Sequence, residues 1–379
     1  MKVAVAVDSF KGSLSANDVC AAVRAGILRV DPACEVIEIP LADGGEGTAE
    51  HLVRATGGVL REVTVTGPLG QPVRAKYGVL GDGVTAVIEM AQASGLSLVP
   101  EASRNPLLTT SYGTGELIRH ALDRGHRKFL IGLGGSATQD GGAGMFRALG
   151  MRFLDERGRE LEAGGAALLR LARIEAKGLD ARLGESTFVV ASDVQNRLVG
   201  PAGASAVFAP QKGATQEMVE RLDAALTQLG EVILAERGVE VRDLPGGGAA
   251  GGIGAATVAF LNASIRSGIE VMLAAVEFDR KIGGADLIIA GEGTLDEQTL
   301  AGKAIAGVSR AAARQGIPVL AICGGISLSG EQLEQLGVAS CSSIVPGPCS
   351  LETAMDRASE WTADAVERMM RVWKTASRR

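Results

Sequence analysis

Four loops of this 379-residue chain combine glycine with acidic or hydroxyl side chains, and each follows an apolar segment typical of a buried strand. The loops read "DSFKGS", "ADGGEGT", "GLGGSATQDGG" and "IAGEGTLDEQT". Glycine lets a backbone approach an anion, and open α/β sheets bind ligands at the carboxyl ends of their strands. A single loop of this kind would equally fit a tight turn without a ligand. Four of them favour a site for a polyanion.

The same loops contain the groups that phosphoryl transfer needs. These are cations or N–H donors for the migrating phosphate, carboxylates for Mg²⁺ and a group that positions the attacking hydroxyl. Lys11 follows the first strand and could contact a phosphate, although a solvated lysine is equally consistent with the sequence. The carboxylates that could bind Mg²⁺ are Asp43 and Glu292, ranked first for their glycine neighbours, and Asp8, Glu46 and Asp296. Each of them could instead cap a helix.

A fifth segment, "VVASDVQN", places Asp193 and Asn196 after another apolar strand. An ionised carboxylate at such a position must be exposed in a cleft or paired. An aspartate close to a substrate hydroxyl is a natural base in kinase chemistry. The alternative is an aspartate that caps the next turn.

The glycine-rich segment "GGGAAGGIGAA" at 246–256 contains G-x-G-x-x-G, but its context is wrong for a dinucleotide fingerprint. That fingerprint follows a buried strand, whereas the residues before it here are "EVRDLP". Two alternatives remain, a helix start that faces ATP phosphates and close helix packing. The "LAGKA" segment around Lys303 lacks the other residues of a Walker A loop, so a P-loop enzyme is excluded.

Composition excludes several classes of function. The net charge is −6 and no run of Lys or Arg occurs, which argues against nucleic acid or an anionic membrane as a partner. No signal peptide and no stretch of eighteen apolar residues is present, so we expect a cytoplasmic protein. Five cysteines without C-x-x-C predict neither disulfides nor a zinc site. All three histidines precede Ser136, which excludes a hydrolase with the order Ser, Asp, His.

Strand, loop and helix alternate in the first and last parts of the chain, whereas 62–90 reads as short antiparallel strands. We therefore predict an α/β protein with a discontinuous, doubly wound Rossmann-like domain over 1–60 and 285–379. A second, mixed α/β domain over 61–284 is inserted into it, although 95–135 could also belong to the first. We expect the active site in the cleft between the two domains.

Taken together and in order, the strings "DSFKGSLSA", "ADGGEGT", "NPLLTTSYGTGELI", "GGSATQDGGAGM", "ASDVQN", "VFAPQKGA", "GGGAAGGIGAA" and "GEGTLDEQTLAGKA" resemble the bacterial glycerate kinase family, type 1. The resemblance spans nearly the whole chain. It implies ATP-dependent phosphorylation of D-glycerate with Mg²⁺ in a two-domain α/β fold. Two positions depart from the family pattern, Gln139 where Asn is common and Arg197 where Pro is common.

With this resemblance, each candidate residue takes a role. We expect Asp193 to orient or deprotonate a glycerate hydroxyl, and Lys11 to neutralise the migrating phosphate. Mg²⁺ would be bound by Asp43 or Glu292. The predicted substrate contacts are Ser136, Thr138, Asn196 and Arg197, the last through the glycerate carboxylate. The predicted contacts to ATP are Gly134, Gly135, Gly247, Gly248 and Gly251.

Several alternatives stay open. A nucleotide or metabolite sensor on the same fold would bind ATP without consuming it. A glycerate dehydrogenase would require NAD binding. Both 2-phosphoglycerate, which we favour, and 3-phosphoglycerate are conceivable products, and a homodimer is one conceivable assembly.

Overall fold

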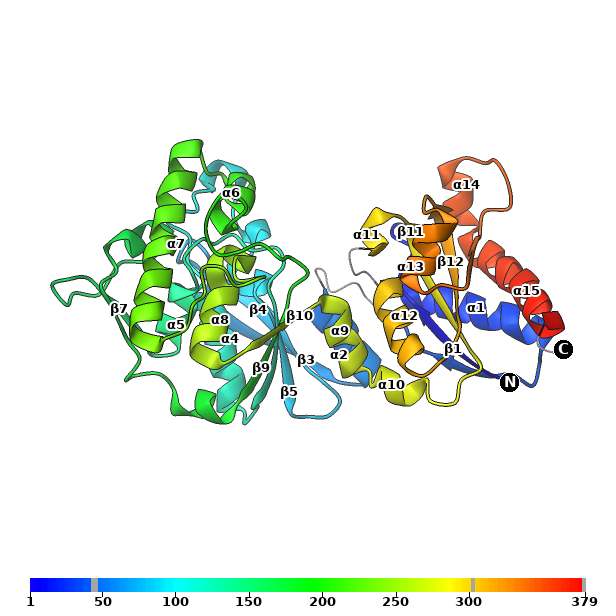
Figure 1. The fold of residues 1–379 in the computed structure, drawn as a ribbon. Coiled ribbons are helices and arrows are strands. Elements are labelled where there is room, and N and C mark those ends of the chain that lie inside the picture. The colour runs from blue at the N-terminus through cyan, green and yellow to red at the C-terminus, as the bar shows by residue number, and fades with distance from the viewer. Residues whose placement is uncertain (42–46, 301–303, 377–379) are drawn as a thin grey trace. The chain divides into compact units, whose positions relative to one another are not determined.

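The computed structural model describes residues 1–41, 47–300 and 304–376, which fold into two compact α/β units (Figure 1). Unit 1 comprises Met1–Asp43 and Ile269–Arg379, and unit 2 comprises Gly44–Gly268. The predicted fold class, a discontinuous α/β domain with a second α/β domain inserted, is confirmed. The chain passes from one unit to the other at 43/44 and at 268/269, whereas the sequence predicted these boundaries at 60/61 and 284/285. Residues 95–135 belong to unit 2.

Unit 1 is built on a five-stranded sheet in which every pairing is parallel. Its order is β13-β12-β11-β1-β2. Its first strand, with the sequence KVAVAV, is buried on both faces, as expected for a sheet covered by helices on both sides. The strands are β1 (Lys2–Val7), β2 (Glu35–Glu38), β11 (Leu287–Leu295), β12 (Val319–Ile326) and β13 (Ser340–Ser343).

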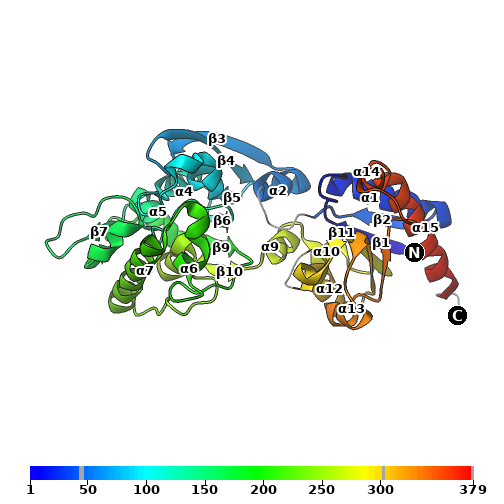
Figure 2. The same cartoon turned by 90° about the horizontal axis from the view of Figure 1, so that it is seen from above.

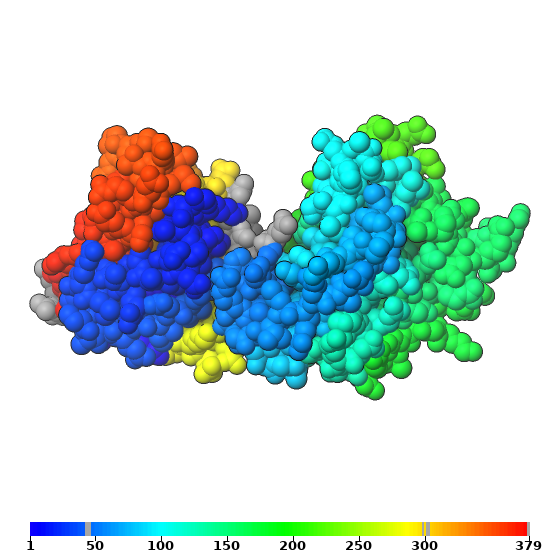
Figure 3. Space-filling view, turned by 180° about the vertical axis from the view of Figure 1, so that it is seen from behind, coloured from blue at the N-terminus to red at the C-terminus, as the bar shows by residue number. Residues whose placement is uncertain are grey.

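Helices cover both faces of this sheet, with α1 and α15 on one side and α12 and α13 on the other (Figure 2). A capping box between Ser15 and Asp18 begins α1, as the sequence predicts. A Cβ on Gly26 would lie 2.4 Å from the Ala363 carbonyl oxygen, so glycine permits the close approach of α1 and α15. The C-terminal helices therefore lie against the N-terminal residues (Figure 3). The helices are α1 (Ala16–Val30), α9 (Gly268–Ala275), α10 (Phe278–Lys281), α11 (Glu297–Leu300), α12 (Ala304–Arg314), α13 (Gly330–Leu336), α14 (Leu351–Asp356) and α15 (Ala358–Ala376).

The strand order of unit 1 reverses direction between β1 and β11. From β1 the chain continues through α1 to β2 on one side, whereas β11, β12 and β13 follow one another on the other side. Connections that leave in opposite directions open a crevice at the carboxyl ends of the two central strands, which is where open α/β sheets bind ligands. The first glycine-rich loop starts at this crevice, whereas the fourth predicted loop begins as strand, because its residues up to Leu295 form the end of β11.

Unit 2 is built on a six-stranded sheet with the order β10-β9-β6-β5-β4-β3. The pairs β3–β4 and β4–β5 are antiparallel, as the alternating pattern of 62–90 predicts, and the rest are parallel. The strands are β3 (Val59–Thr66), β4 (Pro72–Val79), β5 (Thr85–Glu89), β6 (Lys128–Gly132), β9 (Thr187–Ala191) and β10 (Ser264–Arg266), with β7 (Arg152–Leu154) and β8 (Arg173–Glu175) paired separately.

The longest helix of unit 2 among the described residues, α7, agrees with its sequence pattern. Thr215 caps its start, Gly238 ends it with φ of 68°, and Leu222, Leu226 and Leu229 are fully buried. The helices are α2 (Thr48–Thr56), α3 (Ala91–Ser94), α4 (Tyr112–Asp123), α5 (Ala143–Ala148), α6 (Ala204–Phe208), α7 (Gln216–Arg237) and α8 (Ile253–Leu261), with short 3₁₀ turns at Pro210–Lys212 and Ala249–Gly252.

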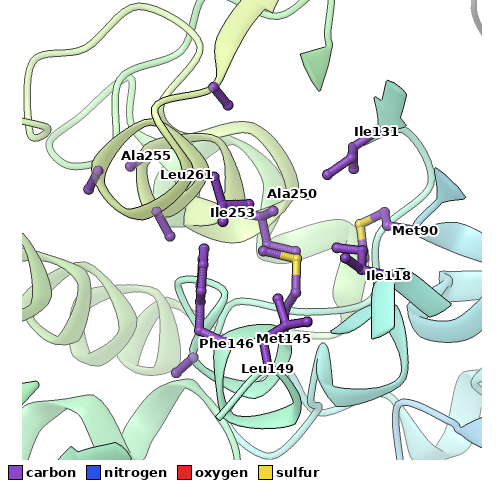
Figure 4. Packing of buried hydrophobic residues seen from close by; sticks show 14 of the residues in the cluster. Met90, Ile118, Ile131, Met145, Phe146, Leu149, Ala250, Ile253, Ala255 and Leu261 are labelled. Atoms are coloured by element: carbon purple, nitrogen blue, oxygen red, sulfur yellow. The ribbon is translucent and has the colours of Figure 1, made fainter. Parts of the chain in front are cut away.

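The apolar core of unit 2 includes the start of α8 and the helix α5 (Figure 4). Ala250 has φ of 52°, a strained value for a residue with a Cβ, and its methyl group is buried in this core. Gly251 and Gly252 follow with φ of 67° and 100°. Three consecutive left-handed residues thus turn the chain sharply into α8.

Candidate functional site

The crevice of unit 1 contains a cavity of about 610 Å³ at the carboxyl ends of β1 and β11. The cavity brings together two residues that the sequence analysis singled out, Lys11 and Glu292, together with Asp8 and Asp296. It also has an apolar part, to which Phe10, Ile344, Val345, Leu351, Ala354, Met355 and Ala358 contribute. A cavity of this size that joins charged groups to an apolar wall fits a small amphipathic ligand.

Two buried carboxylates belong to this cavity. Asp8 is 8% exposed and Glu292 is 5% exposed. The backbone N–H of Ser9 donates to Asp8 Oδ1 at 2.6 Å, and the Thr299 hydroxyl donates to Glu292 Oε1. Donors of this kind stabilise the ionised form of a carboxyl group. The crevice therefore holds preorganised oxygen ligands next to a lysine.

The helix α14 forms part of the apolar wall. The Ser13 hydroxyl donates to the Met355 carbonyl oxygen at 2.8 Å, which ties the loop after β1 to α14. Gly12, with φ of 78°, allows this approach, because a Cβ there would lie 2.8 Å from Met355 Cε. Neighbouring residues of one loop thus connect the polar and apolar parts of the cavity.

The predicted magnesium ligand Asp43 lies outside the described residues. Over 1–41, 47–300 and 304–376, no group of three or more His, Cys, Asp or Glu side chains is arranged to hold a metal ion. Mg²⁺ in a nucleotide site uses only one or two carboxylates, because phosphate oxygens and waters complete its shell. The hard oxygen donors Asp8 and Glu292 fit this chemistry.

The carboxyl edge of the unit 2 sheet carries the third glycine-rich loop and the Asp193 segment on neighbouring strands. The N–H of Leu133, after β6, donates to the carbonyl oxygen of Ala191, the last residue of β9, at 3.3 Å. Gly134 and Gly135 are exposed, and their N–H groups donate to no acceptor among the described residues. Ser136 follows and is 9% exposed. Unpaired N–H groups of consecutive residues can bind an anion.

Beneath this loop lies a lysine that sequence reasoning did not single out. Lys212 is 2% exposed, and its Nζ donates to Ser136 Oγ and to the Thr138 carbonyl oxygen, both at 2.8 Å. Burial lowers the pKa of Lys212 to about 7, while the charge of Asp140 acts in the opposite direction. Thr138 itself is fully buried, and its hydroxyl has no hydrogen-bond partner.

Asp140 fixes the end of the same loop. Its buried carboxylate accepts hydrogen bonds from the N–H and hydroxyl of Ser111, at 2.8 Å each, and from the N–H groups of Gly142 and Gly144. Burial raises the pKa of Asp140, and these donors oppose the rise. Gln139 is also buried, with its Nε2 donating to the Ala204 carbonyl oxygen at 3.0 Å and its Oε1 unpaired. The departure from Asn is thus accommodated against the first residue of α6.

The remaining polar residues of the predicted site lie in the segment after β9, at the same edge of the sheet. Asp193 is exposed, and its Oδ1 accepts from the Gly268 N–H at 2.8 Å. The side-chain amide of Asn196 donates to the Ala202 carbonyl oxygen at 2.9 Å, which braces its own loop. Arg197 is exposed and forms an ion pair with the equally exposed Asp243 at 2.8 Å. Of the three side chains, Asp193 lies nearest in sequence to the strand end.

The segment at 246–256 packs against these loops. The N–H of Gly247 donates to the Leu244 carbonyl oxygen, and that of Gly248 donates to the Asn196 carbonyl oxygen at 2.9 Å. A Cβ on Gly251 would lie 2.1 Å from the Thr138 carbonyl oxygen, so glycine is needed for the close approach. The glycines therefore connect the loop after β6 to the loop after β9. Of the two alternatives for this segment, the described contacts favour close packing.

Comparisons with known proteins agree with this architecture. The sequence profile of the glycerate kinase family matches residues 3–374. The chain is 50% identical over 361 residues to "Glycerate kinase" of Bacillus subtilis, covering 95% of this chain and 94% of that protein. It is 46% identical over 354 residues to "Glycerate 2-kinase" of Escherichia coli K12, covering 93% of both.

A solved structure is also similar over its whole length. It comes from Salmonella typhimurium LT2, its protein carries the provisional name glycerate kinase 2, and it aligns with a TM-score of 0.89 and 48% identity over 100% of both chains. The family profile and the relatives named as glycerate kinases show that this two-unit α/β protein is a kinase. The chain belongs to the glycerate kinase family.

Proposed function

We propose that this kinase phosphorylates D-glycerate with ATP and Mg²⁺ and produces 2-phosphoglycerate. The observation that carries the proposal is the cavity at the reversal point of unit 1, where Lys11 and buried carboxylates adjoin an apolar wall. A nucleotide needs both halves, because its base is apolar and its phosphates bind a cation. In the described part of the chain, no helix is both long and apolar enough to span a membrane.

In this proposal unit 1 binds the nucleotide. The base lies against Ile344, Ala354 and Met355, and Lys11 pairs with the phosphates. Glu292, with Asp8 or Asp43, would hold Mg²⁺, which would supply positive charge to neutralise the phosphates. The hydrogen bond from Thr299 keeps the Glu292 carboxylate oriented.

Unit 2 binds the acceptor. Gly134 and Gly135, which the sequence analysis assigned to ATP, are assigned in this proposal to the acceptor: their N–H groups and the Ser136 hydroxyl bind its anionic group. Thr138 acts through its carbonyl oxygen, which accepts a hydrogen bond from Lys212. Asp193 orients or deprotonates the attacking hydroxyl. The Gly268 N–H donates to Asp193 Oδ1 and thereby holds the carboxylate at the strand end.

The other predicted residues act at the margin of this site. Gly247, Gly248 and Gly251 act by packing, since two of these N–H groups are used within the fold and the third glycine allows a close contact. Asn196 braces its loop. Arg197 contributes a positive charge at the edge of the site for the glycerate carboxylate, but it also pairs with Asp243. Because both side chains are exposed, Arg197→Ala is expected to raise the KM for glycerate only a few-fold. An unchanged KM would remove Arg197 from the site.

Support for the 2-hydroxyl comes from chemistry and from a relative. The 2-hydroxyl is adjacent to the carboxylate, so a site that anchors the carboxylate also fixes this hydroxyl. The Escherichia coli relative carries the name "Glycerate 2-kinase".

The direct test is phosphorus NMR of the purified chain with ATP, Mg²⁺ and D-glycerate. We expect a phosphoglycerate signal that is split into a doublet by the single proton on carbon 2. A triplet would identify the 3-phosphate instead. Nucleotide binding without product would favour a sensor, and binding of NAD in place of ATP would favour a dehydrogenase.

A further inference from the structure

Lys212 is the one buried lysine or arginine in the described part of the chain. Burying a cation is costly unless it is paired, yet no carboxylate of the described residues lies within ion-pair distance of its Nζ. Its two acceptors, Ser136 Oγ and the Thr138 carbonyl oxygen, are both neutral. The carboxylate that interacts with it electrostatically, Asp140, already accepts four hydrogen bonds of its own.

The hydrogen bond to Ser136 sets the direction of that hydroxyl. An ammonium group can only donate, so Ser136 Oγ must accept from Lys212 and its own proton points elsewhere. Ser136 is partly exposed and directly follows Gly134 and Gly135, whose N–H groups are also unpaired in the described structure. The loop therefore offers several donors, one of which is oriented by a buried positive charge.

We propose that Lys212 is a positioning residue for the acceptor substrate: its ammonium orients the Ser136 hydroxyl to donate to the carboxylate of D-glycerate, and the bound carboxylate keeps Lys212 protonated. This inference rests on the proposed function and adds a residue that the sequence did not indicate. A phosphate group of the nucleotide has the same anionic chemistry and is the competing occupant of the loop.

Loss of the proton from Lys212 would reverse the arrangement. A neutral amine can accept a hydrogen bond, so the Ser136 hydroxyl would turn its proton toward Nζ and present a lone pair to the anion. Because burial places the pKa of Lys212 at about 7, the change falls within the working range of an enzyme. The charged group that acts on Lys212 is Asp140, which favours the protonated form. Arg104 lies beside the neighbouring residue Gly213, where its Cβ would be 2.7 Å from a Cβ on that glycine.

Isothermal titration calorimetry of the full chain with D-glycerate tests the proposal, in two buffers of different ionisation enthalpy between about pH 6 and pH 9. We expect binding to take up close to one proton above pH 7, with the affinity falling by up to about tenfold per pH unit there. Lys212→Met should bind more weakly and show no proton uptake. Ser136→Ala, a milder change, should likewise weaken binding and flatten the pH dependence. Lys177→Met, at an exposed lysine of the same unit, should behave as the wild type.

Steady-state kinetics adds a readout that a purely structural role would not change in the same way. We expect Lys212→Met to raise the KM for D-glycerate while the KM for ATP stays the same. If Lys212→Met does not fold, the wild type and Ser136→Ala decide the question. Glycerate binding without proton uptake, or with the same pH dependence in Ser136→Ala, would overturn the proposal.

Three further outcomes separate this inference from the proposed function. Proton uptake that accompanies a non-hydrolysable ATP analogue instead of glycerate would assign the loop to the phosphates and overturn the carboxylate role. A wild-type chain that makes phosphoglycerate but binds glycerate independently of pH would overturn the role of Lys212 alone. A wild type that neither binds nor phosphorylates glycerate would contradict the proposed function itself.

Discussion

The two units present the carboxyl edges of their parallel strands in different ways. In unit 1 the strand order reverses between β1 and β11, and a cavity of about 610 Å³ lies at the reversal. In unit 2 the parallel strands β5, β6, β9 and β10 follow one another in chain order. Their edge is filled by loops that hydrogen-bond to one another, as between Gly141 and Gly251. In unit 1 the reversal of strand order leaves a cavity at the strand ends. In unit 2 the contacts between loops fill the edge and hold hydrogen-bond donors there.

The two sheet edges also differ in the charge that they offer to a ligand. Unit 1 offers buried carboxylates, Asp8 and Glu292, which suit a metal and its nucleotide. Unit 2 offers a buried ammonium and unpaired N–H groups, which suit a carboxylate. Under the proposed function, one fold class would supply both halves of a phosphoryl transfer from the same structural position, the strand end.

The largest effect is expected at Asp193, because the proposal gives unit 2 the base as well as the anion site. Asp193→Asn keeps an oxygen that can accept from the Gly268 N–H but removes the negative charge. We expect kcat to fall by about 10²–10⁴-fold with little change in thermal stability. Stopped-time product assays measure this fall. Asp123→Asn, at an exposed aspartate at the end of α4, is the control, and near-normal turnover of Asp193→Asn would contradict the assignment.

A smaller effect, confined to one ligand, is expected from filling the unit 1 cavity. Ala354 is half-buried on α14 and lines the cavity, so Ala354→Trp should occupy the space proposed for the base. We expect ATP affinity to fall by at least about tenfold, equivalent to about 1.4 kcal/mol, with unchanged glycerate affinity. Calorimetric titration with each ligand measures both. Ala313→Trp, on the exposed side of α12, should change neither, and normal ATP affinity in Ala354→Trp would place the nucleotide elsewhere.

The third effect is on stability instead of activity and concerns the pH dependence of folding in unit 2. Folding lowers the pKa of Lys212 from 10.5 to about 7, so between these values the unfolded chain binds the extra proton. The contribution of this group to the free energy of unfolding therefore rises with pH across that window, by up to about 1.4 kcal/mol per pH unit. Below pH 7 both states are protonated, and the full cost of burying the charge remains.

The measurement compares urea unfolding of wild type and Lys212→Met between about pH 7 and pH 10. We expect the variant to be the more stable protein at pH 7 and to lose this advantage as pH rises. Lys177→Met removes an exposed lysine and should follow the wild-type curve. Parallel curves for wild type and Lys212→Met would show that Lys212 keeps an ordinary pKa.

Local patterns predicted the elements that depend on local chemistry. The capping box of α1 and the boundaries of α7 agree with the sequence, because caps and periodic apolar residues act within a few turns. The sequence alone predicts one terminal helix over 350–373, whereas the structure divides this segment at Arg357 into α14 and α15. Its first part lines the cavity and its second packs on α1, and two different partners require a change of direction.

In unit 1 the sequence predicted the candidate site from glycine-containing segments at the ends of strands. Lys11 and Glu292, far apart in sequence, line one cavity, as their positions after parallel strands suggest. Lys212 lies in a short turn after a proline, where a lysine normally faces solvent, and its burial depends on long-range packing under the loop after β6. The burial of Asp140 likewise depends on a distant partner, Ser111, to which it is hydrogen-bonded. Only tertiary structure could reveal this polar network.

The central claim is that the two edges bind different substrates, and hydrogen–deuterium exchange of the wild-type chain tests it most directly. One sample contains a non-hydrolysable ATP analogue with Mg²⁺, and the other contains D-glycerate alone. The account predicts that the nucleotide protects the segments around 8–15 and 292–300, whereas glycerate protects 134–140. Protection of 134–140 by the nucleotide, with no change there on adding glycerate, would contradict it.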